Sequence, residues 1–189
     1  MTGVILFRAQ PFHNGHLHMV KTAIRDCIRN LNGDLHIFIG SADKCGTPRN
    51  PLPIELREDL VRETLRQTLP ANEFAKVHIH RLNDLTDEAD NSLDWGKYLY
   101  MKITEKTHDE AIQFYYTDTP QIMLSWFEGS DLLQEVVSFK FLERYKDISA
   151  TKVRKAILNN YDQMLTLIPN YVYGKKDEIK KYLEEAYNK

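Results

Sequence analysis

The sequence has few cysteines and no long apolar run. Its two cysteines, Cys27 and Cys45, lie 18 residues apart and form no Cys-x-x-Cys pair. A disulfide framework or a cysteine-based zinc site is therefore not expected. No stretch approaches the roughly 18 consecutive apolar residues of a membrane-spanning helix, and the opening MTGVILFRAQPF lacks a basic start and a small-residue cleavage site. We expect a soluble, cytoplasmic protein with no membrane partner.

An excess of one charge sign is also missing. The chain has 25 Lys and Arg against 27 Asp and Glu, a formal charge of −2, and no basic run. A nucleic-acid partner is therefore not indicated. Its 42% hydrophobic and 28% charged residues are typical of a globular protein. For 189 residues we expect one domain, in which residues 160–189, rich in Tyr and Lys, form a C-terminal helical cover.

Short apolar, strand-like segments alternate with segments of helical periodicity. The strand candidates are residues 3–7, 34–39, 76–82, 111–117 and 137–142. The helix candidates are residues 15–30, 54–68, 93–104, 120–127, 151–158 and 175–187. The alternation predicts an α/β fold: a Rossmann-like, doubly wound and mostly parallel sheet of five to six strands with helices on both faces. In such sheets ligands bind beyond the carboxyl ends of the strands.

The apolar stripe of the first helix candidate is regular. It consists of residues spaced by three and four: Leu17, Val20, Ile24, Cys27, Ile28 and Leu31. We expect this stripe, including the Cys27 thiol, to face the core.

The segment FRAQPFHNGH, residues 7–16, lies between the first strand and this helix. The usual phosphate-binding patterns, GxGxxG and the P-loop, are missing from the sequence. Gly15 would let the backbone approach a ligand, and the helix that it opens has free N–H groups. His13 and His16 flank this glycine, and Arg8 adds a fixed positive charge. The segment therefore indicates an anion site at a strand-to-helix junction.

FRAQPFHNGH resembles the signature of the HxGH nucleotidylyltransferases, most closely that of the archaeal-type nicotinamide mononucleotide adenylyltransferases, G-R-x-Q-P-F-H-x-G-H. Phe7 stands where that pattern has glycine. The resemblance implies that His13 and His16 are catalytic, acting on the phosphates of ATP. It also implies that Phe7, Arg8 and Gly15 lie against the nucleotide.

The segment IGSADKCGTPRNPLPIELR, residues 39–57, resembles the family's I-G-S-A segment, its N-P pair and the helix that follows. By that match Arg49 lies near the triphosphate and Ser41 lies on the acceptor side. Arg57 takes the place of the arginine that opens the helix, and Leu56 stands where the family has glutamate.

The segment ISATKVRKAI, residues 148–157, resembles the family motif I-S-x-T-x-[IV]-R. A serine or threonine at a helix N-terminus accepts hydrogen bonds from free N–H groups. The resemblance implies that Ser149 and Thr151 lie at the phosphates and that Arg154 neutralises the β- and γ-phosphates as a catalytic cation. Taken alone, such a motif is more often a simple helix cap.

Two further segments match less closely. NSLDWGKYL, residues 91–99, resembles the segment whose tryptophan stacks on the nicotinamide ring, with Trp95 in that place and Asp94 as an extra residue. A core position is the alternative for this tryptophan. FYYTDTP, residues 114–120, replaces the family's S-G-N-P, and it places Thr117 beside the nucleotide.

The resemblance implies transfer of AMP from ATP to nicotinamide mononucleotide, with Mg²⁺ carried by the ATP phosphates, no metal-binding residue, and a homo-oligomer. Three alternatives stay open: a related enzyme for pantetheine phosphate or a CTP-dependent cytidylyltransferase, a fragment of a class I aminoacyl-tRNA synthetase, and a nucleotide-binding regulator without catalysis. His78 and His80 share one face of a strand candidate. A polar face is the favoured interpretation, and a metal-binding pair is the alternative.

Overall fold

The computed structural model describes residues 2–86, 92–109, 111–117 and 125–188. Its sheet has five strands in the order β3-β2-β1-β4-β5, and every neighbouring pair is parallel. The strands are β1 (Thr2–Phe7), β2 (Asp34–Ile39), β3 (Val77–Arg81), β4 (Ile112–Tyr116) and β5 (Val137–Phe141). The predicted doubly wound parallel sheet is therefore confirmed, with five strands.

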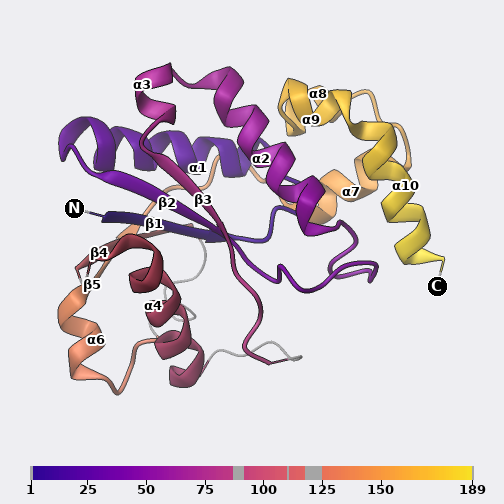
Figure 1. Ribbon diagram of the computed structural model, residues 1–189. Helices are drawn as coiled ribbons and strands as arrows, with labels where there is room; N and C mark the ends of the chain where they lie inside the picture. Colours follow the sequence, from indigo (N-terminus) through magenta and orange to yellow (C-terminus); the bar gives the residue numbers. More distant parts are fainter. Residues whose placement is uncertain (1, 87–91, 110, 118–124, 189) are drawn as a thin grey trace.

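Helices cover both faces of this sheet, with α1 and α2 on one side and α4 and α6 on the other (Figure 1). The helices are α1 (Asn14–Ile24), the π-helix η1 (Arg25–Asn30), α2 (Ile54–Thr68), α3 (Ala71–Phe74), α4 (Leu93–Thr107), α6 (Asp131–Val136), α7 (Ala150–Leu158), α8 (Met164–Leu167), α9 (Asn170–Gly174) and α10 (Lys176–Tyr187). Neighbouring residues of a strand point to opposite faces. Ile5 accordingly joins the apolar core beneath α1 and α2, while Val4 joins the core beneath α4 and α6.

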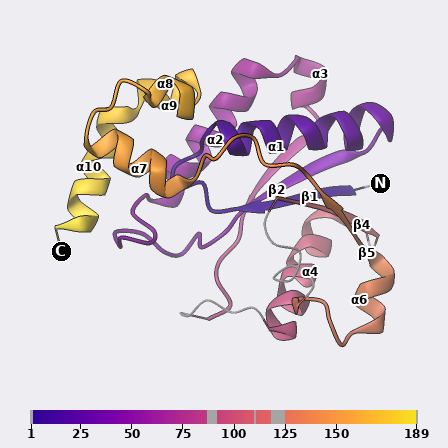
Figure 2. The same cartoon turned by 180° about the vertical axis from the view of Figure 1, so that it is seen from behind.

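The C-terminal helices lie beside α2 and α7 (Figures 1 and 2). Val172 of α9 and Leu183 of α10 are buried in the same core as α2. The Tyr171 hydroxyl donates to Asp59 Oδ2 at 2.9 Å, which ties α9 to α2. This packing brings the C-terminal segment next to the α7 N-terminus, where part of the predicted site lies.

The sequence predicts β2 and α2 with their observed bounds, and the other four strands, α4, α7 and α10 within a few residues, whereas the short helices α3, α6, α8 and α9 are not predicted individually. The first helix is the main departure, since it continues from α1 into η1. A π-helix has more residues per turn than an α-helix, so the spacing of three and four no longer keeps one face inward. Leu31, expected on the buried stripe, is 46% exposed for this reason, whereas Cys27 is buried as expected. Most of the helix predicted over residues 120–127 lies outside the described residues.

Among the described residues, no helix combines the length and the apolar character needed to span a bilayer.

Candidate functional site

A cavity of about 920 Å³ opens at the carboxyl ends of the central strands. Its walls come from the loops that follow β1, β2 and β4 and from the N-terminal ends of α1 and α7. β1 lies between β2 and β4, so strand order reverses here, as expected for a ligand site in this fold. The residues predicted for the site all line this cavity: Phe7, Arg8, His13, Gly15, His16, Ser41, Arg49, Trp95, Thr117, Ser149, Thr151 and Arg154.

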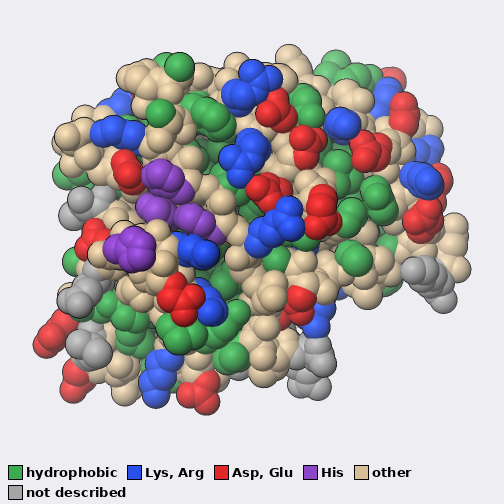
Figure 3. Space-filling view, viewed as in Figure 1, with side chains coloured by type: hydrophobic (Ala, Val, Ile, Leu, Met, Phe, Trp, Pro, Cys, Tyr) green, Lys and Arg blue, Asp and Glu red, His purple; other side chains and the backbone are tan. Residues whose placement is uncertain are grey.

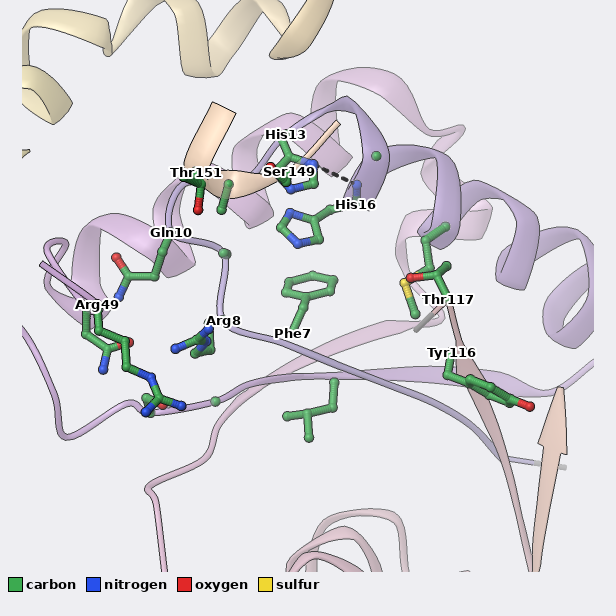
Figure 4. Close-up of a pocket in the computed structure, with 18 of the residues that line it drawn as sticks. Phe7, Arg8, Gln10, His13, His16, Arg49, Tyr116, Thr117, Ser149 and Thr151 are labelled. Carbon is green, nitrogen blue, oxygen red and sulfur yellow. Dashed lines mark hydrogen bonds between the residues drawn. The ribbon is translucent and has the colours of Figure 1, made fainter. Parts of the chain in front are cut away.

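The two histidines form one rigid unit at the start of α1. His13 is the N-cap residue, and its Nδ1 accepts a hydrogen bond from the His16 backbone N–H at 3.3 Å (Figure 4). The rings of His13 and His16 stack with centroids 3.6 Å apart, and Phe7 contacts the other side of His16 at 4.7 Å. A Cβ at Gly15 would come within 3.0 Å of the His13 ring. Any other residue at this position would therefore crowd the His13 ring, whereas glycine leaves room for it.

Burial keeps both imidazoles neutral. It lowers the pKa of His13 to about 4, with a smaller contribution from the Arg144 charge. Burial also lowers the pKa of His16 well below its ordinary value, and the neighbouring His13 adds to this. Since His13 Nδ1 accepts a hydrogen bond, the proton of the neutral ring lies on Nε2. His16 Nδ1 is buried and has no hydrogen-bond partner among the described residues. Both rings can therefore donate to an anion in the cavity.

Three guanidinium groups gather on one side of these rings. Burial lowers the pKa of Arg8, and the charges of Arg49 and Arg154 lower it further. Figure 4 shows Arg8 and Arg49 on one side of the stacked rings of Phe7, His16 and His13. Mutual repulsion of like charges is relieved when a polyanion binds between them. This wall of the cavity therefore suits a phosphate chain.

Arg154 is held by contacts from three segments. It donates from Nη1 to the Gln10 carbonyl at 3.0 Å, from Nη2 to Thr151 Oγ1 at 3.3 Å, and from Nε to the Tyr187 hydroxyl at 3.1 Å. Ser149 caps α7 by accepting the Lys152 N–H at 3.3 Å. The Ser149 side chain thus orders the start of α7. Other N–H groups of the first helical turn have no acceptor within the helix and can donate to an anion in the cavity.

Two tryptophans form another part of the cavity wall. Trp95 is 8% exposed and meets Trp126 edge to face, with centroids 6.1 Å apart. A Cβ on Gly96 would lie 1.7 Å from the Trp126 carbonyl oxygen, so only glycine allows this approach. Ser41 donates to Asp84 Oδ1 at 3.0 Å. Trp95 is therefore mostly buried, as a core residue would be, and it also lines the cavity, as a residue that stacks on a ligand would.

Arg57 does not line the cavity but supports its walls. It is fully buried and donates to the carbonyls of Arg8, Gly40 and Ser41 at 2.8–3.0 Å, and to that of Lys44 at 3.4 Å. It thereby joins the loops that follow β1 and β2. Burial lowers its pKa to about 10, which still leaves it charged at neutral pH.

Sequence reasoning gave no role to Gln10 and Asn50, which also line the cavity. Gln10 accepts from the Leu52 N–H at 2.9 Å and donates to the Leu52 carbonyl at 3.4 Å, so it holds the loop that carries Arg49. Asn50 is buried, and its Oδ1 has no partner among the described residues. Gln10 stands inside the FRAQPFHNGH motif, and Asn50 stands in the N-P pair of residues 39–57, so each residue lay in a usable signal.

Comparisons with known proteins agree with this geometry. A family model described as Cytidylyltransferase-like matches residues 8–156. A nicotinamide-nucleotide adenylyltransferase from Methanococcus aeolicus is 29% identical over 187 residues, covering 95% of this chain and 90% of the relative. One from Saccharolobus solfataricus is 24% identical, covering 92% and 88%.

A solved structure shares the fold. It is a bifunctional NMN adenylyltransferase/ADP ribose pyrophosphatase from Francisella tularensis, crystallised with AMP and a manganese ion. The match has a TM-score of 0.73 at 19% identity and covers 99% of this chain. The chain spans about half the length (52%) of that protein.

Proposed function

Because the chain belongs to the cytidylyltransferase-like family, we propose that it is a nicotinamide-nucleotide adenylyltransferase. It transfers AMP from ATP to nicotinamide mononucleotide and releases pyrophosphate. The observation that carries the proposal is the stacked pair of His13 and His16 at the start of α1, in a cavity whose lining includes the arginines Arg8, Arg49, Arg144 and Arg154.

The reaction needs no covalent intermediate. An oxygen of the mononucleotide 5′-phosphate attacks the α-phosphorus of ATP in line, a new phosphoanhydride bond forms, and the bond to the β-phosphate breaks with pyrophosphate as the leaving group. Negative charge develops on the α-phosphate oxygens and on pyrophosphate. Catalysis then consists of positioning the two reactants and of stabilising that charge.

In this proposal the histidines and arginines divide the phosphates between them. His13 donates from Nε2, and with His16 it holds the oxygens of the α- and β-phosphates. Arg8, Arg49 and Arg154 hold the pyrophosphate part, which the planar guanidinium can bind through two oxygens. Ser149 and Thr151 order the α7 N-terminus beside it, and Phe7, Gly15 and Thr117 border the nucleotide. ATP enters as its Mg²⁺ complex, since Mg²⁺ prefers phosphate and water oxygens.

The acceptor lies on the aromatic side of the cavity. Trp95 presents a ring to nicotinamide, and Ser41, which donates to Asp84, lines the same cavity. We also propose that the chain works in the cytoplasm as one domain of residues 1–189, as a homo-oligomer, and with neither nucleic acid nor membrane as a partner. Light scattering on the purified chain measures its assembly.

A product assay tests the function. The purified chain is mixed with Mg²⁺ and with ATP or CTP, each paired with nicotinamide mononucleotide, nicotinate mononucleotide or pantetheine phosphate, and the products are separated by chromatography. We expect NAD and pyrophosphate from ATP and nicotinamide mononucleotide. Product from another pair alone would replace the substrate assignment, and nucleotide binding without any product would favour a regulator.

Replacing Trp95 with leucine should raise the KM for nicotinamide mononucleotide about tenfold, because stacking of an aromatic ring on a base is worth roughly 1–3 kcal/mol. The KM for ATP should stay nearly constant. Leucine keeps the position apolar, and Trp95→Phe serves as the matched control because it keeps an aromatic face. Steady-state kinetics with each substrate varied in turn measures the effect. An unchanged acceptor KM in Trp95→Leu would leave this tryptophan as a core residue only.

Replacing Tyr187 with phenylalanine should raise the KM for ATP about two- to tenfold, because one hydrogen bond contributes roughly 0.5–1.5 kcal/mol. The lost hydroxyl accepts from Arg154 Nε and is a positioning group for that arginine. Tyr161→Phe removes a hydroxyl from an exposed tyrosine and should change nothing. An equal change in both variants, or a loss of stability without a change in KM, would remove Tyr187 from this role.

A further inference from the structure

A second group of potential ligands lies away from the cavity, on β2 and β3. Asp34 and His36 alternate on β2 and so point to the same face, and His78 and His80 do the same on β3. The strand register pairs His36 with His78 and so brings the four side chains together. Figure 3 shows histidine side chains gathered on this side of the molecule. We refer to Asp34, His36, His78 and His80 as the β2–β3 cluster.

The cluster has the spacing of a metal site. Asp34, His36 and His78 each offer a ligand atom, and these atoms all lie within 4.8 Å of one another. His78 Nε2 is 3.1 Å from Asp34 Oδ2, and the His36 and His78 rings have centroids 4.6 Å apart. In a tetrahedral zinc site with bonds of about 2.0–2.1 Å, ligand atoms lie roughly 3.3 Å apart. Small side-chain rotations therefore suffice to bring the three atoms onto one ion.

His80 completes the arrangement without being a ligand. His36 Nδ1 and His80 Nε2 are 2.9 Å apart and share one hydrogen bond. When His36 donates that proton, the lone pair on its other nitrogen is free for a metal. A ligating histidine commonly donates its second ring nitrogen to such a partner, which fixes its tautomer and orientation.

The three proposed ligand residues differ in exposure. His36 is buried, whereas Asp34 and His78 are half-exposed, so the cluster is open to solvent on one side. The charges facing the cluster are the Asp34 carboxylate, Asp109, and Lys106 of α4, whose charge acts on His80. The cation Lys106 thus acts on the non-ligand side of the cluster.

We propose that Asp34, His36 and His78 form a binding site for one Zn²⁺ ion, with water in the fourth position. Two imidazoles and one carboxylate are a donor set that zinc accepts. The ion joins the edge strand β3 to β2. His36 lies four positions before Gly40 at the cavity, which is roughly 13 Å along a strand. The site is therefore structural and takes no part in the reaction in the cavity.

Zinc titration of the full chain after metal removal tests the proposal. We expect one Zn²⁺ per chain by calorimetry, the visible absorption of four-coordinate Co²⁺ when cobalt replaces zinc, and a higher Tm with Zn²⁺. In Asp34→Asn and His78→Gln, both half-exposed positions, zinc affinity should fall at least tenfold and the rise in Tm should disappear. His18→Gln, a histidine on α1, is the matched control and should bind zinc like the unmodified chain.

Two outcomes would overturn the proposal: no zinc binding by the unmodified chain, or binding that persists unchanged in both variants. The second would place the ion at other histidines, such as His13 and His16. Circular dichroism of the metal-free variants verifies that they fold. None of these readouts depends on adenylyl transfer, so this site and the proposed function can fail separately.

Discussion

Replacing His16 with alanine should lower kcat about 100-fold or more while the chain stays folded. Removing one preorganised donor to a developing oxyanion typically has this effect. The His16 ring stacks between His13 and Phe7, and its buried Nδ1 has no partner in the described residues. A donor that is rigidly held in this way can stabilise the charge of the transition state without first reorganising.

The measurement is steady-state formation of NAD from saturating ATP and nicotinamide mononucleotide. His18→Gln, which changes a histidine of α1 that does not line the cavity, is the control and should keep kcat unchanged. Circular dichroism and Tm establish that the His16→Ala variant is folded. A kcat within threefold of the unmodified chain would contradict the role given to this residue.

Replacing Arg57 with methionine should lower the free energy of unfolding by about 3–5 kcal/mol, because several backbone carbonyls lose a charged hydrogen-bond donor at once. The guanidinium is fully buried and donates to four carbonyls. Methionine removes the Arg57 donor from these carbonyls, of which that of Ser41 keeps a second donor, the Lys44 N–H at 3.1 Å. A buried unpaired polar group costs roughly 1–3 kcal/mol. Two residues in these loops also have left-handed backbone, Ala9 with φ 53° and Ser41 with φ 50°. The Arg57 hydrogen bonds help to hold them there.

Urea unfolding compares this variant with Arg62→Met on the same helix. Arg62 is half-exposed and pairs only with Glu58 among the ion pairs of the described residues. Its loss should cost at most about 1 kcal/mol. Stability of Arg57→Met within 1 kcal/mol of the unmodified chain would show that the carbonyls find other donors. Arg57→Lys should lie between the two, because an ammonium cannot reach all four carbonyls at once.

The parts of the molecule that local sequence predicts are those whose physics is local. The strands and α2 follow from apolar periodicity, and the site at the β1 end follows from a motif of ten residues, 7–16. His13 and His16 lie three apart at a helix start, so their proximity could be read from the sequence alone.

The rest depends on contacts between distant segments. The role of Arg57 arises because the loops after β1 and β2 end side by side, which no local pattern reveals. The β2–β3 cluster depends on strand register, which pairs His36 with His78. Local sequence does not mark His36 as a ligand, because a single histidine in a buried strand has no distinctive spacing. The exposure of Leu31 follows from a π-helix that periodicity cannot anticipate.

The central claim is that the cavity directs attack at the α-phosphorus of ATP. Labelled ATP tests it most directly: one preparation carries ³²P in the α-phosphate and another in the γ-phosphate, each mixed with Mg²⁺ and nicotinamide mononucleotide. The account predicts the α label in NAD and the γ label in pyrophosphate, in equal amounts. Label from the γ-phosphate on the acceptor, or the α label only in free AMP or ADP, would contradict it.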